Sequence, residues 1–212
     1  MTGSYDIILK DGIVILPEGT HQTDIGVRDG KIAAIGSLRS EKALSVIDCH
    51  GLHILPGVID TQVHFREPGV THKEDLKHGL MAAAAGGVTA VFEMPNTNPL
   101  TTTPEAVADK MSRAAQSALV DYAFYLGGTS DNAVQLADWE NTPGVCGIKI
   151  FMGASTGDLL SATDEEITAI LKHGKRVVAV HAEDEMIMNE NKKTILGDSD
   201  DVRMHPVWRS AE

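Results

Sequence analysis

The first 55 residues carry alternating apolar and polar positions in short stretches separated by turn signals. Lys10-Asp11-Gly12 and Asp29-Gly30 each lie between two such stretches and are typical of hairpin turns. The pattern predicts a small antiparallel sheet module over residues 1–55. Its expected strands cover residues 5–10, 13–16, 23–27, 31–35 and 45–47.

After Pro56-Gly57 the pattern changes to an apolar strand, a glycine-rich or polar loop and then an alanine-rich helix. This alternation repeats about every 30 residues, which is typical of parallel βα units. The pattern therefore predicts five βα units over residues 56–212, in a doubly wound sheet or a (β/α)₈ barrel. Because no G-x-G-x-x-G motif follows a strand, the dinucleotide-binding form of the open sheet is disfavoured. The expected strands begin near residues 58, 89, 121, 147 and 177, and the expected helices cover 73–85, 104–117, 131–141 and 163–173.

Helix-start signals support two of these helices. Thr103 followed by Pro104 is typical of a cap and a first helical residue. Thr163 and Glu166 have the spacing of a capping box.

Composition narrows the class of protein further. The formal net charge of −12 disfavours nucleic acid and anionic lipid as partners. The 42% hydrophobic content allows a large aliphatic core, and no apolar run reaches the roughly 20 residues of a membrane span. Cys49 and Cys146 are too few for a disulfide framework, and no leader-like segment is evident, so we expect a cytoplasmic protein.

Chemistry is expected at the carboxyl ends of the parallel strands, because both candidate folds place their sites there. Period-two alternation would put Gln62, His64 and Arg66 on one face of the first strand. Lys149 lies within an apolar strand, where a buried amine needs a partner or a lowered pKa. A neutral Lys149 could add carbon dioxide, and the resulting carbamate could bridge two divalent cations. His181 ends the fifth strand, where imidazole nitrogens could bind zinc together with His64.

Each of these residues also has an ordinary structural explanation. The polar row at residues 62–66 is also expected where a strand leaves the core for solvent. Asn96 lies between two prolines, where asparagine commonly serves turn geometry. Lys149 could extend to the rim of the sheet, and a single histidine at a strand end is commonly a packing residue. Only the combination at neighbouring strand ends favours a site.

Four motifs follow one another along the chain: LPGVIDTQVHFREPG at 55–69, EMPNTNP at 93–99, GIKIFMG at 147–153 and VHAE at 180–183. Together they make the chain resemble dihydroorotase of the amidohydrolase superfamily. The resemblance implies a (β/α)₈ barrel with a small β-sandwich, of which residues 1–55 would be the N-terminal part. It also implies hydrolysis of L-dihydroorotate to N-carbamoyl-L-aspartate, reversibly, in pyrimidine biosynthesis.

The resemblance also implies roles for individual residues. His64 and His181 would each bind one zinc, and Lys149 would be the carboxylated bridge between the two. Arg66 and Asn96 would hold the substrate carboxylate, a role for which a bidentate guanidinium is well suited. One or two zinc ions per complete subunit are therefore expected, with poor occupancy in these 212 residues alone.

Two departures from the family pattern keep other interpretations open. Gln62 stands where most members have histidine, which makes it a doubtful zinc ligand. Five βα units leave three unaccounted for, and the catalytic aspartate would lie beyond residue 212. A silent scaffold for a partner such as aspartate transcarbamoylase is one alternative, and a hydantoinase or allantoinase is another. The expected partners are a small-molecule substrate, further copies of the chain and other pyrimidine-pathway enzymes.

Overall fold

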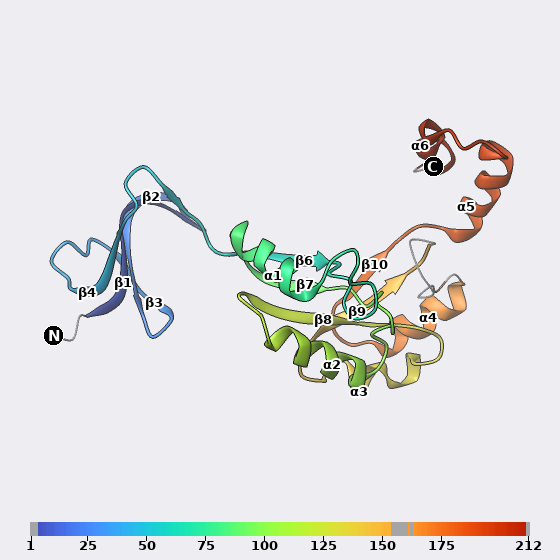
Figure 1. Cartoon of the computed structure of the whole chain (residues 1–212), viewed down its shortest axis with the longest axis horizontal. Coiled ribbons are helices and arrows are strands. Elements are labelled where there is room, and N and C mark those ends of the chain that lie inside the picture. The colour runs from blue at the N-terminus through green and yellow to red at the C-terminus, as the bar shows by residue number, and fades with distance from the viewer. Residues whose placement is uncertain (1–3, 154–160, 162, 211–212) are drawn as a thin grey trace. The chain divides into compact units, whose positions relative to one another are not determined.

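The computed structural model describes residues 4–153, 161 and 163–210 of the chain (Figure 1). Contacts divide it into two compact units, Met1–Gly57 and Val58–Glu212.

The first unit contains a five-stranded mixed sheet in the order β3-β2-β1-β4, with β5 also paired to β1. The central strand β1 pairs antiparallel with β2 but parallel with β4 and β5. The prediction of an antiparallel module is therefore wrong for half of the sheet, because the chain crosses from the β3 edge to the opposite side of β1. The strands are β1 Tyr5–Leu16, β2 Gly19–Arg28, β3 Lys31–Gly36, β4 Ala43–Asp48 and β5 His53–Ile54.

The predicted turn at Lys10-Asp11-Gly12 is also wrong. Strand β1 runs straight through it, and the pairing with β2 shifts register between Leu9 and Gly12, as at a β-bulge. Asp11 takes a φ of 57°, and its N–H donates to Oδ1 of the buried Asp24 at 2.8 Å. A distant carboxylate thus stabilises a bulge where local sequence rules indicate a hairpin.

The second predicted turn is confirmed. Asp29 and Gly30 have φ values of 53° and 70° and connect β2 to β3, with Arg28 paired to Lys31. Two successive residues with positive φ are what a type I′ turn requires, and the Asp-Gly sequence meets that need at low cost.

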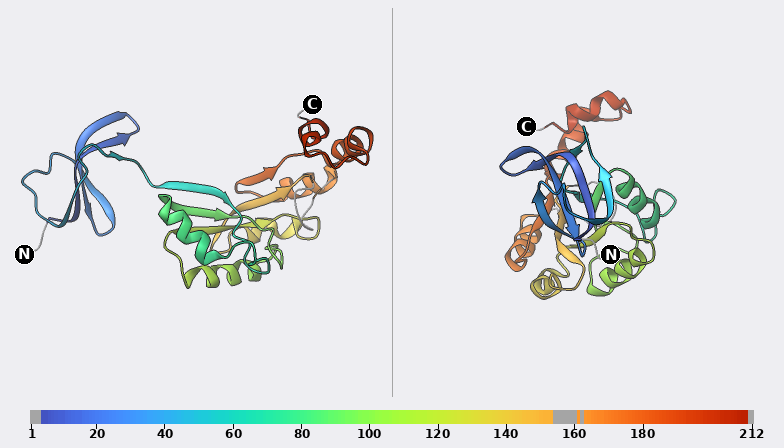
Figure 2. Two further views of the ribbon diagram at one scale, coloured as in Figure 1. Left: turned by 45° about the horizontal axis from the view of Figure 1, so that its top comes forward. Right: turned by 90° about the vertical axis from the view of Figure 1, so that its left-hand side faces the viewer.

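The second unit is built on five parallel strands in the order β10-β9-β8-β7-β6. This confirms the prediction of parallel βα units. The sheet is curved, with helices along its outer side (Figure 2). Its strands are β6 Val58–Val63, β7 Val88–Glu93, β8 Asp121–Gly127, β9 Val145–Phe151 and β10 Val178–His181.

Two of the helices begin where the capping signals place them. Thr103 caps α2 with Pro104 in its first turn, and Thr163 forms the predicted capping box with Glu166. The first helix begins later than residue 73, because the Asp75 side chain caps it by accepting from the His78 N–H at 2.7 Å. The α-helices are α1 Leu76–Ala85, α2 Pro104–Ala115, α3 Leu136–Trp139, α4 Asp164–His173, α5 Glu185–Asn191 and α6 His205–Trp208; 3₁₀ turns cover Ala133–Gln135 and Val202–Met204, and a π-helix covers Lys192–Leu196.

The core of the second unit lies between the strands and the helices. One cluster joins β8 and β9 to the segments around α2, α3 and α4, and a second joins β7 and β8 to α1 and α2. Gly79 lets α1 approach closely, since a Cβ there would lie 2.3 Å from the Phe65 ring. No helix within the described residues is long and apolar enough to cross a membrane.

Candidate active site

Lys149 projects from the face of β9 that is opposite the helices. Its neighbours Ile148 and Ile150 are fully buried in the cluster beneath α2–α4. Because side chains alternate along a strand, Lys149 and Phe151 point to the other, concave side of the sheet. The Nζ atom of Lys149 lies 4.9 Å from the centre of the Phe151 ring.

The environment of Lys149 favours an uncharged amine. The side chain is 1% exposed. Burial lowers the pKa of the Lys149 ammonium from its usual range. A neutral amine is the form that adds carbon dioxide, so this surrounding fits the predicted modification.

His181 shares the concave face with Lys149. It pairs in register with Phe151 across β9 and β10, and the two rings lie 6.3 Å apart. The structure therefore places Lys149 and His181 on the same face of two adjacent strands, β9 and β10.

One ring nitrogen of His181 is already engaged. Its Nε2 lies 2.6 Å from Oε2 of Glu183, which also forms an ion pair with Arg209. Hydrogen bonds lower the pKa of Glu183 to about 2, with the largest contribution from Arg209 and the next from His181. A metal bound to His181 would use Nδ1 or displace the Glu183 carboxylate.

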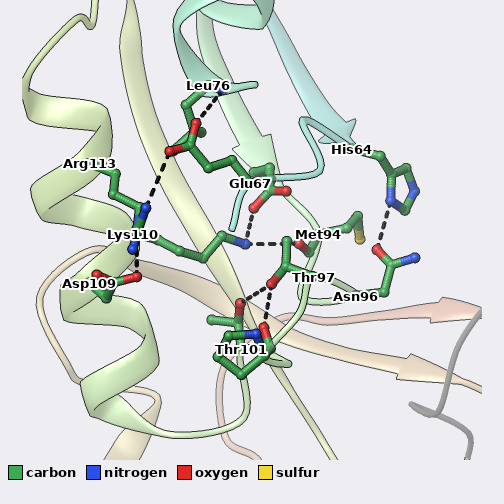
Figure 3. A network of polar contacts seen from close by, with 12 residues as sticks. His64, Glu67, Leu76, Met94, Asn96, Thr97, Thr101, Asp109, Lys110 and Arg113 are labelled. Carbon is green, nitrogen blue, oxygen red and sulfur yellow. Dashed lines mark hydrogen bonds and ion pairs between the residues drawn. The ribbon is translucent and has the colours of Figure 1, made fainter. Parts of the chain in front are cut away.

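His64 and Asn96 meet at the ends of the first two barrel strands. Nδ1 of His64 lies 2.8 Å from Oδ1 of Asn96, as Figure 3 shows. An amide oxygen only accepts, so Nδ1 carries the hydrogen and Nε2 keeps a lone pair that could bind a metal. Burial lowers the pKa of His64, the bond to Asn96 opposes this shift, and the charges of Arg66 and Lys149 add to it. The hydrogen bond from His64 to Asn96 and the charges of Arg66 and Lys149 therefore all act on the His64 ring.

The predicted common face of Gln62, His64 and Arg66 is wrong. Strand β6 ends at Val63, and Arg66 takes a φ of 61°, so strand alternation does not extend to residues 64–66. Gln62 lies within β6 and is exposed. The loop, rather than the pleat of the strand, positions His64 and Arg66.

A buried ion pair beside this loop was missed by sequence reasoning. Glu93, the last residue of β7, pairs with Lys110 of α2, and their side chains are 2% and 1% exposed. Burial raises the pKa of Glu93 to about 7 and lowers that of Lys110. Lys110 follows Val107 by three residues on the buried face of α2, so its place in the apolar helical pattern was the available signal.

Asn132 links the loops that follow β7 and β8. Its buried amide donates to the carbonyls of Thr102 and Gly127 at 2.9 and 2.8 Å and accepts from the N–H of Thr129 at 2.9 Å. This network also explains why the helix predicted from residue 131 begins only as a 3₁₀ turn at Ala133.

We expect Asn132→Ala to lower the free energy of unfolding by about 1–3 kcal/mol, because it removes the side-chain partner of two backbone carbonyls and one backbone N–H. Urea denaturation of this variant and of the exposed control Asn189→Ala measures the difference. A loss no larger than that of the control would contradict the structural role.

The residues fit a metal only in part. Within residues 4–153, 161 and 163–210, no three His, Cys, Asp or Glu side chains are grouped closely enough to hold an ion. His64 nevertheless has its ring oriented by an outer hydrogen bond, a common feature of metal-binding histidines. Lys149 would become an oxygen donor after carboxylation.

Comparison with known proteins assigns the chain to the cyclic-amidase branch of the amidohydrolases. The family model described as Dihydro-orotase-like matches residues 51–191, and the chain belongs to that family. An allantoinase of Deinococcus radiodurans is 38% identical over 186 residues, covering 85% of this chain and 41% of the relative. A dihydroorotase of Methanosarcina acetivorans is 36% identical over 197 residues, covering 91% and 42%.

Solved structures identify the fold. An L-hydantoinase (dihydropyrimidinase) from Arthrobacter aurescens superposes with a TM-score of 0.82 at 34% identity, covering 89% of this chain and 43% of that one. The fold is thus the predicted (β/α)₈ barrel type with an N-terminal sheet module, of which the chain contains five βα units. The chain thus spans 41% and 42% of the length of the two curated relatives.

Proposed function

We propose that the protein carrying this chain is a metal-dependent hydrolase that opens five-membered cyclic ureides of the allantoin or hydantoin type. The observation that carries this proposal is the buried Lys149 on the concave face, flanked by His181 and electrostatically linked to His64. Allantoinases and a hydantoinase among the relatives support this choice of ring over the dihydroorotate expected from the motifs.

The chain's own residues divide into three roles in this proposal. His64, His181 and a carboxylated Lys149 would hold the metal, whose chemistry is to polarise an amide carbonyl and acidify a water. The Asn96 hydrogen bond fixes the His64 ring with Nε2 available. Burial around Lys149 excludes water and keeps its amine able to react with carbon dioxide.

Dihydroorotase activity is the second candidate, and Arg66 favours it. Its charge acts on both His64 and Glu93, so the guanidinium lies near the site. A guanidinium suits the exocyclic carboxylate of dihydroorotate, which allantoin and hydantoin lack.

Arg66→Ala separates the two candidates. Hydrolysis of hydantoin, allantoin and L-dihydroorotate is measured with the full-length protein that carries these residues, supplied with zinc, cobalt or manganese. If Arg66 binds a substrate carboxylate, the variant should lose about 10- to 100-fold more kcat/KM on dihydroorotate than on hydantoin, because a hydrogen bond to a charged group is lost. Ureide hydrolysis unaffected by this change supports the main proposal, and no turnover of any of the three rings contradicts it.

A further inference from the structure

The buried Glu93–Lys110 pair holds the segment that carries Asn96, the hydrogen-bond partner of His64. Glu93 ends β7 opposite Val63, whose carbonyl accepts from the N–H of Met94 at 2.9 Å. Lys110 Nζ donates to the backbone carbonyl of Met94 at 3.1 Å, two residues before Asn96. One ion pair therefore anchors the start of the loop from which Asn96 reaches His64.

The position of Lys110 is itself fixed. Its stem crosses the Phe124 ring, with Nζ 4.9 Å from the ring centre, and the side chain is almost fully buried on α2. Figure 3 shows Lys110 reaching from this helix toward Met94, beyond which Asn96 faces His64. Helix α2 thus supports the loop after β7 through Lys110.

We propose that the Glu93–Lys110 pair is a positioning element that sets the His64–Asn96 contact and thereby presents Nε2 of His64 for metal binding. The metal role rests on the proposed function, whereas the positioning of the ring does not. The pair is a positioning element and not a catalytic one, since Lys110 contacts Glu93 and the backbone carbonyl of Met94.

The test uses the double variant Glu93→Gln/Lys110→Met in the full-length protein. This variant removes both charges together and keeps similar side-chain volumes, so it avoids a buried unpaired ion. Nitrogen-15 spectra of the metal-free protein report the tautomer of His64, assigned by comparison with His64→Gln. We expect one tautomer, with the hydrogen on Nδ1, in the parent and a mixture in the double variant.

Zinc affinity, measured by competition with a chromophoric chelator, provides the second readout. Loss of an outer partner of a metal-binding histidine commonly costs about 10- to 100-fold in affinity, and we expect a loss in this range. Asn96→Ala should give the same loss, and adding the double variant to it should give little more, because both act through one contact. The control Asp109→Asn/Arg113→Met removes an exposed ion pair on the same helix and should change neither readout.

Full additivity of the two changes, or one unchanged His64 tautomer in both Asn96→Ala and the double variant, would overturn the inference. Asn96→Ala leaves the buried pair intact, so it tests the role of the His64–Asn96 contact even if the double variant unfolds. The tautomer measurement does not require the protein to turn over a substrate. A protein inactive on every ring but with a Lys110-dependent tautomer would therefore refute the proposed function alone.

Discussion

Replacing Lys149 with methionine should abolish cyclic-amide hydrolysis by the full-length protein while leaving the barrel folded. Methionine is unbranched and apolar, and suits a side chain that is 1% exposed beside Phe151. The variant removes the amine that β9 presents beside Phe151 on the concave face. Metals in such sites supply several kcal/mol of stabilisation to the transition state, so we expect kcat to fall by about a thousandfold or more.

The chemistry of the side chain explains the size of this effect. A neutral amine forms a bond to the carbon of carbon dioxide and releases a proton, giving an anionic carbamate with two oxygen donors. The lowered pKa of Lys149 enlarges the neutral fraction near pH 7 and so favours this reaction. Methionine can do none of this.

Two measurements check the Lys149 prediction. Turnover is compared with that of Lys172→Met, an exposed lysine of α4 that serves as the matched control. Native mass spectrometry should show one added carbon dioxide on the parent and none on the Lys149 variant. A variant with more than a tenth of parental activity, or an unmodified parent that is fully active, would show that the bridge is not needed.

The largest effect on stability is expected from Lys110→Met. This change leaves Glu93 buried without its partner, and breaking a buried ion pair on one side typically costs about 3–5 kcal/mol. Urea denaturation at pH 8 measures the loss. The double variant Glu93→Gln/Lys110→Met should recover most of it, because no unpaired charge remains.

The pH dependence of the Lys110→Met variant has a definite sign. In the parent the pKa of Glu93 is raised to about 7, with Lys110 opposing the rise, so removing Lys110 should raise this pKa further. The folded state then holds a proton that the unfolded carboxyl releases above its ordinary value of 4.5. The variant should therefore lose stability as pH rises from about 5 to 8, and regain it on acidification.

The double variant provides the control for this slope, since neither of its two replacement side chains, an amide and a thioether, titrates. Its stability should follow the parent's remaining groups over the same range. A single variant whose unfolding free energy stays constant between pH 5 and pH 8 would contradict the assignment of the slope to Glu93.

Local signals were sufficient for much of the secondary structure. Pro104 after Thr103, the Thr163–Glu166 box and the Asp29-Gly30 turn all lie where their own short-range chemistry places them. Each depends on hydrogen bonds or φ preferences within four residues, which neighbouring sequence alone can satisfy. The parallel βα order followed from the same kind of repeat.

The sequence by itself also determined the candidate site residues, because a lysine in an apolar strand and histidines at strand ends stand out from their surroundings. Only the tertiary structure decided how these residues are held. The bulge at Asp11 depends on a hydrogen bond to Asp24, and the tautomer of His64 depends on Asn96. The loop after β7, which carries Asn96, is held by the hydrogen bond from Lys110 to the Met94 carbonyl. These partners are separated by 13 to 32 residues, and such contacts form only when the sheet and its helices bring distant segments together.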